Sequence, residues 1–558
     1  KEPPPAAAAA VDRLPGARGT ALDPLQAAHA GAVGAAAVGA PQHQRQIGPE
    51  GRQQLGALST SRALPAPLAR VLLYGEPARE RHAALPLSCA ELPCATVERR
   101  DLIRPRGNLD AFYSAYEVWD ELGRGSFGTV DRVRHKATGL LRAVKRVPRA
   151  SLREQRWQDV QSEVEALSDL DHPNIVRLFE YFDTPEELLL VEELCTGGTL
   201  EAYLAVKGGR LAADDAARVL RQMLKAVLCC HLHGLVHRDL KADNFMFAAP
   251  GGDAALMLID FGLSQRGGAL EAAAGTLTHS APEVLCAGTR YGPPADMWSL
   301  GAILYRMLTG EHLISGLVDT PSKLRRWLSG ESVEQECIRK ARDGAYIQGR
   351  LEAARAAPDV PGEAYELLEA LLQEDPARRP SALRALSHPF VLASYLPASP
   401  AGGAGFDVEM IPKMRHFAGL PAFERVAILM EAHILGPHDD PLLGTDYLSF
   451  RAADVAGRGV LTHSEIADAL RSHNLEVPAD LPELCHAIDI SGDGLVNLVE
   501  FIAATAAPQV YRRARLCKAT FRALDADGNG KIDPMDLEVF LKPGPRRAEV
   551  AAAVIAEV

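Results

Sequence analysis

The sequence lacks the features of a membrane-spanning or disulfide-stabilised protein. No run of about twenty strongly apolar residues occurs, so no segment is long enough to cross a bilayer as a helix. The nine cysteines are scattered and form no CxxC pair. This distribution favours reduced thiols in the cytoplasm over disulfides or zinc ligands. We therefore expect a soluble, cytoplasmic protein.

The sequence also lacks an excess of positive charge and a starting methionine. Its formal net charge is −12, which argues against general binding to nucleic acid. Residue 1 is Lys, so we expect the true start to lie upstream, and any lipid-attachment signal there lies outside the sequence. The length of 558 residues exceeds one compact core and predicts about three or four units. We expect the chain to be a monomer.

Large apolar side chains are scarce at the beginning of the chain. Stretches such as "KEPPPAAAAAVDRLPGARG" are dominated by Ala, Pro, Gly and Arg. Such a composition buries too little apolar surface to offset the entropy lost on ordering. We therefore predict that residues 1–110 form a disordered arm.

A glycine-rich turn follows between two segments of alternating polarity. In "YEVWDELGRGSFGTVDRVRH", Gly123, Gly125 and Gly128 stand at a hairpin tip, where backbone without side chains can lie over phosphates. Val130 follows in a position to cover an adenine ring. The GxGxxG pattern alone is a weak signal, because a plain glycine turn has the same spacing.

Charged residues that suit phosphoryl transfer come next in the chain. "RAVK" places Lys145 on the following strand, and a helical pattern after it carries Glu163, which can hold the lysine against phosphates. The reaction needs positioned charges more than covalent chemistry. Both residues are therefore candidate catalytic groups.

Two further motifs complete the set. "VHRDLKADN" carries Asp239, suited to accept the proton of an attacking hydroxyl, and Lys241, suited to neutralise the transferred group. Asn244 in the same motif and Asp260 in "LIDFG" supply oxygens that can hold magnesium.

These motifs in this order resemble the catalytic domain of protein kinases over residues 113–392. "APEVL", "DMWSLG" and "DPARRPSALRALSHPF" follow where that family has them, and the family pairs Glu283 with Arg379. The resemblance implies a two-lobed α+β fold, with protein substrates. The residues implied to bind ATP are Leu122, Gly123, Gly125, Gly128, Val130, Ala143, Lys145, Glu193, Cys195, Asn244 and Asp260. The sequence after Lys241 resembles the serine/threonine form of the catalytic loop.

Two positions depart from the usual pattern of such enzymes. Glu192 falls at the back of the adenine pocket, where a carboxylate needs a partner or a raised pKa; the alternative is a register shifted by one residue. The segment after Asp260 has only Glu271 where a phosphorylated residue often stands. We therefore expect control from elsewhere in the chain.

Calcium-type loops near the end of the chain offer that control. Such loops place oxygen ligands at positions 1, 3, 5, 7, 9 and 12, with Gly at position 6. The loop at 489–500 offers Asp489, Ser491, Asp493, the Leu495 carbonyl, Asn497 and Glu500. The loop at 525–536 offers Asp525, Asp527, Asn529, the Lys531 carbonyl, Asp533 and Asp536. Because Asp536 is shorter than the usual Glu, we predict that the loop at 489–500 is the stronger site.

A third loop of the same type, at 454–465, is degenerate. It keeps Asp454, Gly459 and Glu465 but has Ala456 and Arg458 at ligand positions. A missing oxygen and a positive charge predict a hand that only packs. Leu461, Val496 and Ile532 fill position 8 of the three loops, where an apolar residue lets two loops pair as a short antiparallel ladder.

A kinase domain followed by such loops resembles the calcium-dependent protein kinases of plants and protists. The resemblance covers residues 113–558 and implies an autoinhibitory junction at 393–440 and an all-α EF-hand lobe at 441–558. In the junction, Lys413, Arg415 and His416 form a basic cluster that can occupy the substrate groove. The apolar residues of a helix that the calcium-loaded lobe can capture are Leu420, Phe423, Val426 and Ala427.

The sequence therefore predicts a serine/threonine kinase that uses ATP and Mg²⁺ and is activated when Ca²⁺ removes the junction from the groove. Two alternatives stay open: a calcium-independent kinase with a structural lobe, and a calcium-binding adaptor with an inactive kinase fold. Val550 and Ile555 repeat the spacing that precedes the third loop. We expect a fourth hand to begin there and the chain to be cut off within it.

Overall fold

The structure is a computed structural model of the 558-residue chain. It describes residues 97–103, 105, 108–124, 128–151, 154–252, 254–262, 264–266, 278–285, 292–315, 332–394, 406–436, 439–541 and 546–556. Gly125 of the glycine-rich turn, Glu271 and most of the predicted arm lie outside the described residues.

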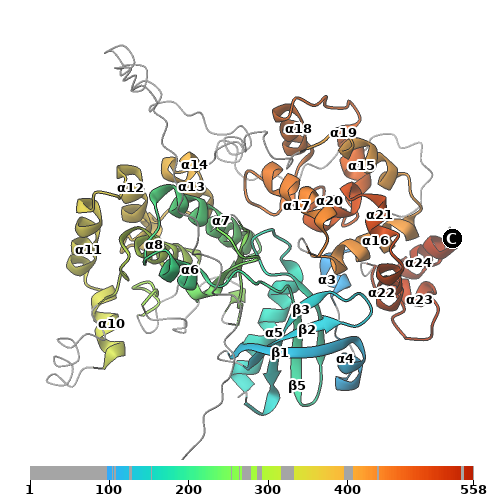
Figure 1. The fold of residues 1–558 in the computed structure, drawn as a ribbon, viewed down its shortest axis with the longest axis horizontal. Helices are drawn as coiled ribbons and strands as arrows, with labels where there is room; N and C mark the ends of the chain where they lie inside the picture. Colours follow the sequence, from blue (N-terminus) through green and yellow to red (C-terminus); the bar gives the residue numbers. More distant parts are fainter. Residues whose placement is uncertain are drawn as a thin grey trace, which may run out of the picture. The chain divides into compact units, whose positions relative to one another are not determined.

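An antiparallel five-stranded sheet forms the first part of the kinase fold (Figure 1, cyan). Its strand order is β1-β2-β3-β5-β4. The strands are β1 (Tyr116–Arg124), β2 (Thr129–His135), β3 (Leu141–Pro148), β4 (Leu178–Asp183) and β5 (Glu187–Glu192). Val144 and Val147, on β3 in the middle of the sheet, have no exposed surface. The helix α5 (Glu154–Asp169) follows β3 and carries Glu163.

A helical lobe follows the sheet and contains the larger apolar core. Its long helices α7 (Ala213–Leu232) and α8 (Pro293–Thr309) pack against each other, and Trp298 and Tyr305 of α8 are almost fully buried. The other helices are α6 (Leu200–Val206), α10 (Val333–Ala341), α11 (Gly344–Ala356), α12 (Gly362–Leu371), α13 (Ala382–Leu386) and α14 (Pro389–Ala393). Two short strand pairs lie in the same part of the chain: β6 (Leu235–Val236) with β9 (Gln265–Arg266), and β7 (Phe245–Phe247) with β8 (Leu256–Leu258).

The helix α4 (Leu109–Ala115) precedes β1 and packs against it. The helices from residue 410 onward build the EF-hand lobe (Figure 1, orange to red). They are α15 (Met410–Ala418), α16 (Ala422–Ile434), α17 (Pro441–Ala453), α18 (His463–Ser472), α19 (Leu481–Ile488), α20 (Leu498–Thr505), α21 (Pro508–Tyr511), α22 (Ala514–Leu524), α23 (Pro534–Glu538) and α24 (Arg547–Ala556). The strands β10 (Val460–Leu461) and β11 (Val496–Asn497) pair, with Leu461 opposite Val496. The predicted ladder between the first two loops is therefore confirmed. The helix α24, expected to open a fourth hand, packs against α23.

The junction helices α15 and α16 are part of the EF-hand lobe's core. Val426 is 3% exposed within this core, and Leu420, Phe423 and Ala427 are partly buried against it. The apolar side of the predicted target helix is thus packed as expected. The basic cluster, however, does not lie in the substrate groove, because Arg415 forms an ion pair with Asp480 beside α19 (2.7 Å). In this structure Arg415 of the basic cluster therefore contacts the EF-hand lobe.

The last part of the predicted arm is folded, which corrects the boundary at residue 110. A short helix, α3 (Arg99–Leu102), follows Val97, and Val97 and Leu102 are buried in the core of the EF-hand lobe. The guanidinium of Arg99 donates hydrogen bonds to the carbonyls of Leu167 (2.6 Å) and Leu178 (3.3 Å) in the kinase domain. Buried apolar side chains and the hydrogen bonds of Arg99 thus both hold this segment in place.

The junction and the kinase domain meet at the C-terminal end of α16. All described residues belong to one compact unit, Leu64–Val558. Arg142 of β3 donates to the carbonyl of Ile434 (2.7 Å) and pairs with Asp439 (2.7 Å), and Arg177 donates to the carbonyl of Leu435 (3.2 Å). The last carbonyls of a helix lack partners within it and carry partial negative charge. The two arginines therefore fix this end of α16 to the kinase domain.

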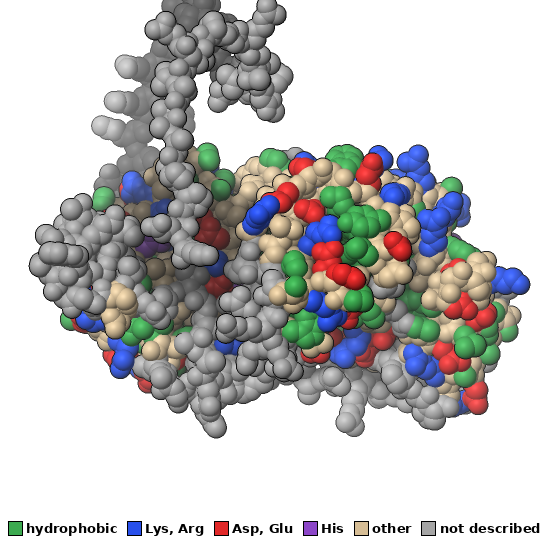
Figure 2. Space-filling view, turned by 90° about the horizontal axis from the view of Figure 1, so that it is seen from below, with side chains coloured by type: hydrophobic (Ala, Val, Ile, Leu, Met, Phe, Trp, Pro, Cys, Tyr) green, Lys and Arg blue, Asp and Glu red, His purple; other side chains and the backbone are tan. Residues whose placement is uncertain are grey.

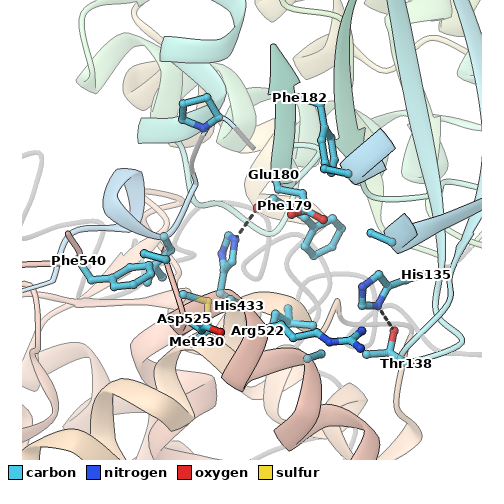
Figure 3. Close-up of a pocket in the computed structure, with 18 of the residues that line it drawn as sticks. His135, Thr138, Phe179, Glu180, Phe182, Met430, His433, Arg522, Asp525 and Phe540 are labelled. Carbon is cyan, nitrogen blue, oxygen red and sulfur yellow. Dashed lines mark hydrogen bonds between the residues drawn. The ribbon is translucent and has the colours of Figure 1, made fainter. Parts of the chain in front are cut away.

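A cavity of about 780 Å³ lies beside this contact. His433 points from α16 toward β4 in Figure 3, and its Nε2 lies 3.0 Å from the carbonyl oxygen of Phe179. The cavity is lined by β4 residues, by Met430 of α16, and by Asp525 and Phe540 of the third hand. The third calcium-type loop and the sheet of the kinase domain thus face the same space.

Charge on the surface shows no segregation by sign where it can be seen. On the face in Figure 2, acidic and basic side chains of the described residues are interspersed. Among the described helices, none combines the length and apolar character that a bilayer crossing requires.

Candidate functional site

Lys145 of β3 lies between two carboxylates, one from α5 and one from the segment after β8. Its amine lies 2.7 Å from Glu163 of α5 and 2.9 Å from Asp260. Burial works against the charged amine, but the carboxylates of Glu163 and Asp260 hold the pKa of Lys145 above its ordinary value. The predicted pair is therefore formed, and a permanent positive charge faces the position expected for phosphates.

Asp239, Lys241 and Asn244 form a second cluster. The amine of Lys241 lies 2.6 Å from Asp239. The Asn244 amide donates to the same Asp239 carboxylate (3.1 Å) and to the Asp239 carbonyl (2.8 Å). These bonds use the Asn244 nitrogen and orient its side chain, so its amide oxygen is the group left to act as a metal ligand.

The backbone around this cluster is held in an unusual conformation. Arg238 and Asp260 both have positive φ angles, of 73° and 62°. Asp296 of α8 accepts hydrogen bonds from the amides of His237 and Arg238 at 3.0 Å each, and from His231 at 2.8 Å. Backbone of this kind persists only where surrounding contacts fix it. Asp296 therefore acts as a buried support for the catalytic loop.

The predicted pair of Glu283 and Arg379 is also present. The two side chains form two hydrogen bonds, of 2.6 and 2.8 Å, and both are buried. Arg379 also donates to the carbonyls of Gln373 (2.8 Å) and Glu374 (3.1 Å). Fully satisfied buried pairs of this type hold segments in one arrangement.

The pairing of β3 with β5 shows where Glu192 lies relative to Lys145. On β5 this residue lies directly opposite Ala143 of β3, two positions before Lys145. This place, within the electrostatic influence of Lys145, agrees with the position predicted for Glu192 at the back of the nucleotide pocket. Burial raises its pKa to about 8, partly countered by the attraction of Lys145. At neutral pH the side chain is mostly a neutral carboxylic acid.

The rest of the predicted nucleotide pocket surrounds these groups. Gly123 pairs with Val130 across β1 and β2. A side chain at Gly128 would place its Cβ 1.7 Å from the carbonyl oxygen of Arg146, so only glycine fits the turn. The side chain of Leu122 is exposed. The backbone amide of Glu193 donates a hydrogen bond to the carbonyl of Arg177 (2.9 Å). Cys195 follows at the end of β5, half-buried.

The loop at 489–500 has the hydrogen bonds of a calcium-type loop. Asp489 at position 1 accepts from the amides of Gly492 (2.7 Å) and Gly494 (2.8 Å). Glu500 at position 12 accepts from the amides of Ser491 (2.7 Å) and Asn497 (2.9 Å). Two further hydrogen bonds support the loop: the Leu495 amide donates to Asp493 (2.9 Å), and the Glu500 amide donates to the Asn497 side chain (2.9 Å).

The loop at 525–536 brings its carboxylates closest together. Oxygens of Asp525, Asp527 and Asp536 all lie within 4.8 Å of one another. The Asp525 Oδ1 atom is buried without a hydrogen-bond partner. An acidic cluster with an unpaired buried oxygen suits a hard cation such as Ca²⁺. The geometry thus favours this loop, whereas the sequence favoured the loop at 489–500.

The remaining residues of this loop support its turn. Asp536 accepts from the amides of Ala526 (2.9 Å) and Asp533 (2.8 Å), so its short side chain still reaches across the loop. Asn529 donates from its side chain to Asp527 (2.8 Å) and accepts from the amide of Lys531 (2.8 Å).

Known proteins with the same order of domains are similar to this chain. Residues 116–391 match the protein kinase domain family, and residues 518–541 match the EF hand family. Calcium-dependent protein kinase 5 of Plasmodium falciparum is 28% identical over 434 residues, which cover 77% of this chain and 72% of that protein. Calcium-dependent protein kinase 34 of Arabidopsis thaliana is 29% identical over 436 residues, 77% of this chain and 78% of that protein. The chain thus carries a protein kinase domain and an EF hand, and over about three quarters of its length it is similar to calcium-dependent protein kinases.

Several functional residues of this protein kinase carry no local sequence signal. Arg142 and Arg177 bind the end of α16 from more than two hundred residues away, and Arg99 reaches the kinase domain from the segment predicted as an arm. The sequence drew attention to Asp296 only as the first residue of the "DMWSLG" motif, which lies near the start of α8. Its role as an acceptor for the catalytic loop became visible only with the fold.

Proposed function

We propose that this kinase transfers the γ-phosphoryl group of ATP to serine or threonine hydroxyls of protein substrates, and that calcium binding to its EF-hand lobe activates it. The observation that carries the catalytic part is the joint placement of Lys145 with Glu163 and of Asp239 with Lys241 in one cleft. Phosphoryl transfer depends on charges positioned in this way.

Each side chain has a role that its position supports. Asp239 accepts the hydroxyl proton as the bond between the substrate oxygen and phosphorus forms and the bond to ADP breaks. Lys241, 2.6 Å from Asp239, offsets the charge on the transferred group. Asp260 and Asn244 supply the oxygens that would hold Mg²⁺, and that ion would neutralise charge on the phosphates.

The choice of serine or threonine as acceptor rests on the catalytic loop. Lys241 lies two residues after Asp239 and contacts it directly, as the serine/threonine form of the loop requires. A panel of matched peptides that differ only in Ser, Thr or Tyr at the acceptor position tests this choice. Phosphorylation of the tyrosine peptide at a comparable rate would overturn it.

Calcium control is supported by the place of the junction. The helices α15 and α16 pack in the core of the EF-hand lobe, and the same α16 is fixed to the kinase domain through Arg142 and Arg177. The carboxylates of the third loop line the cavity that α16 shares with β4. A change in that loop therefore acts on a helix that touches the sheet of the kinase domain.

Peptide phosphorylation measured with calcium and with chelator tests the whole proposal. We expect activity with calcium and a low rate with chelator, in the concentration range of roughly 0.1 to 10 µM calcium that sensor hands use. Equal rates in the two conditions would favour a calcium-independent kinase with a structural lobe. No phosphorylation in either condition, with calcium binding retained, would favour an adaptor with an inactive fold.

A further inference from the structure

The degenerate loop at 454–465 is closed by a side chain of its own. Arg458 at position 5 donates to Glu465 at position 12 over 2.6 Å, and both side chains are more than nine-tenths buried. Asp454 at position 1 accepts from the amides of Arg458 (2.9 Å) and Gly459 (3.1 Å). The first and last carboxylates of the loop thus both accept hydrogen bonds from groups within the loop, and position 3 is Ala456, which is fully buried. The second oxygen of Glu465, Oε1, and the Nε atom of Arg458 are buried without a hydrogen-bond partner.

The backbone of this loop matches the other two. In each loop the glycine amide at position 6 donates to the aspartate at position 1: Gly459 to Asp454 (3.1 Å), Gly494 to Asp489 (2.8 Å) and Gly530 to Asp525 (3.0 Å). In a metal-binding loop, a divalent cation neutralises the carboxylates at positions 1 and 12. The guanidinium of Arg458 bears the positive charge in that role here.

The outer side of the same loop lies against the kinase domain. The amine of Lys225, on α7, donates to the backbone carbonyl of Asp454, and both residues are buried. The Nε2 atom of His172 lies 3.9 Å from the Asp454 carboxylate. A side chain at Gly457 would place its Cβ 2.4 Å from Cγ of Lys225, and one at Gly459 would come within 2.7 Å of the Asp171 carbonyl. The two surfaces are in direct contact.

Neighbouring contacts extend this attachment. Arg451 of α17 donates to Gln222 of α7 (3.0 Å). The amide of Val499, at the start of α20, donates to the Asp171 carboxylate (3.1 Å). Hand one and the start of hand two's second helix are therefore held by one continuous face of the kinase domain, made of α7 and the segment between α5 and β4.

We propose that the first hand is a metal-independent attachment point: Arg458 replaces the calcium ion inside the loop, and the closed loop attaches the EF-hand lobe to the kinase domain through Lys225, Gln222 and Asp171. The attachment persists with and without calcium. Calcium then acts on the other hands and on the junction while the first hand stays in place. This inference concerns attachment and does not depend on whether calcium activates catalysis.

Two glycines provide a matched test of the attachment. Gly457 and Gly528 both occupy position 4 of their loops, with φ angles of 71° and 73°, but a Cβ at Gly528 meets nothing within 4 Å. Gly457→Ala and Gly528→Ala therefore carry the same backbone cost, and only the first clashes with Lys225. Hydrogen exchange is measured on the full chain, in calcium and in chelator.

We expect Gly457→Ala to speed exchange of the amides around Lys225 in α7 by about tenfold or more in both conditions, because an opening equilibrium shifted by about 1.4 kcal/mol changes exchange tenfold. Gly528→Ala should leave those amides as in the wild type. Equal behaviour of the two variants at α7 would overturn the proposed attachment.

The role of Arg458 is tested separately. Arg458→Gln removes the charge, and we expect faster exchange of the amides at 458 and 459, which calcium does not reverse. The exposed Arg471→Gln in the same hand serves as the control. In the double variant Ala456→Asp with Arg458→Asp, which adds oxygens at positions 3 and 5, calcium should restore slow exchange and one more ion should bind. Wild-type exchange in Arg458→Gln, or no rescue of the double variant by calcium, would overturn the replacement of the ion by arginine.

Discussion

The catalytic cleft and the third calcium-type loop both gather carboxylates, but they balance the charge in different ways. In the cleft, Glu163 and Asp260 share Lys145 at 2.7 and 2.9 Å. In the third loop, oxygens of three aspartates approach within 4.8 Å, and the donors described above for them are uncharged: backbone amides and the side-chain amide of Asn529. A cluster that carries its own cation is fixed in one arrangement, whereas a cluster that lacks one responds to a metal.

The first loop resembles the catalytic site, because its carboxylate is also paired with a cationic side chain of the protein. Its Arg458 lies where the third loop has Asn529, and it pairs with the carboxylate at position 12. Loops with the same backbone conformation can therefore either respond to calcium or stay closed without it. One charged side chain decides between the two. The following predictions test this division, beginning with the largest expected effect.

Removing the carboxylate of Asp239 should have the largest effect. We expect Asp239→Asn to lower kcat by about a hundredfold to ten-thousandfold, since a positioned general base contributes that much. The melting temperature should stay close to that of the wild type, because the amide keeps the contact with Asn244. Steady-state kinetics and a thermal melt check both expectations. Asp214→Asn, on the exposed start of α7, is the control and should leave kcat unchanged.

Loss of one ligand in either calcium-type loop should raise the calcium concentration needed for activity. We expect about a tenfold increase or more for the more important loop, since the ion loses a charged ligand. Asp525→Asn probes the third loop and Glu500→Gln the second, each in a calcium titration of peptide phosphorylation.

The increase in the required calcium concentration, compared between the two variants, shows which loop matters more for activation. A larger shift for Asp525→Asn would support the ranking given by the clustered carboxylates. A larger shift for Glu500→Gln would support the ranking read from the sequence. Unchanged titrations in both variants would show that neither loop controls the activity.

Two buried histidines should make the contact between the lobes sensitive to acid. Burial lowers the pKa of His172 to about 4 and that of His433 to about 3. Both lie where the EF-hand lobe and junction meet the kinase domain. The pKa of each histidine in the docked state lies below its ordinary value. The stability that each neutral histidine gives to the contact is therefore complete above about pH 6.5 and is lost as the pH falls.

The expected loss is about 1.4 kcal/mol for each histidine and each pH unit below 6.5. Hydrogen exchange at α7 and β4, compared at pH 7.5 and 5.5 after correction for the intrinsic rate, measures it. His433→Gln should reduce the pH dependence, whereas the exposed His486→Gln should not. A contact of equal stability at both pH values would contradict the assignment of neutral, buried histidines.

Glu192 should produce the smallest effect, and only at high pH. Burial raises its pKa to about 8, so it ionises as the pH rises through that value and adds a negative charge near Lys145. We expect the KM for ATP to rise by about threefold between pH 7 and 9. Glu192→Gln should remove this rise while leaving the KM at pH 7 almost unchanged. The same rise in the variant would assign it to another group.

The catalytic groups could be predicted from the sequence because their spacing along the chain is tied to the strands and turns that carry them. The loop around Asp239 and the pair of Glu283 with Arg379 formed as predicted. The ladder between Leu461 and Val496 was predicted for the same reason, since position 8 of each loop points to its pair.

Contacts between distant segments could not be predicted in this way. Nothing in the composition of residues 97–103 indicates that Arg99 will reach carbonyls in the kinase domain. The sequence indicated that Arg458 disfavours a metal, but its ion pair and the approach of Lys225 depend on the folded loop. The relative strength of the second and third loops depends on distances between oxygens, which the ligand pattern alone does not contain.

The ladder between the first two loops has a consequence for the shape of the calcium response. In an ordinary pair of hands, filling one loop prepares the other, and this cooperativity makes the response steep. Here Leu461 holds Val496 from a loop that is already closed by Arg458. Calcium binding to the second loop therefore does not depend on calcium binding to its partner loop. Within this pair, calcium binding should follow a simple saturation curve with a Hill coefficient of about one, so the kinase would grade its output over a broad range of calcium signals.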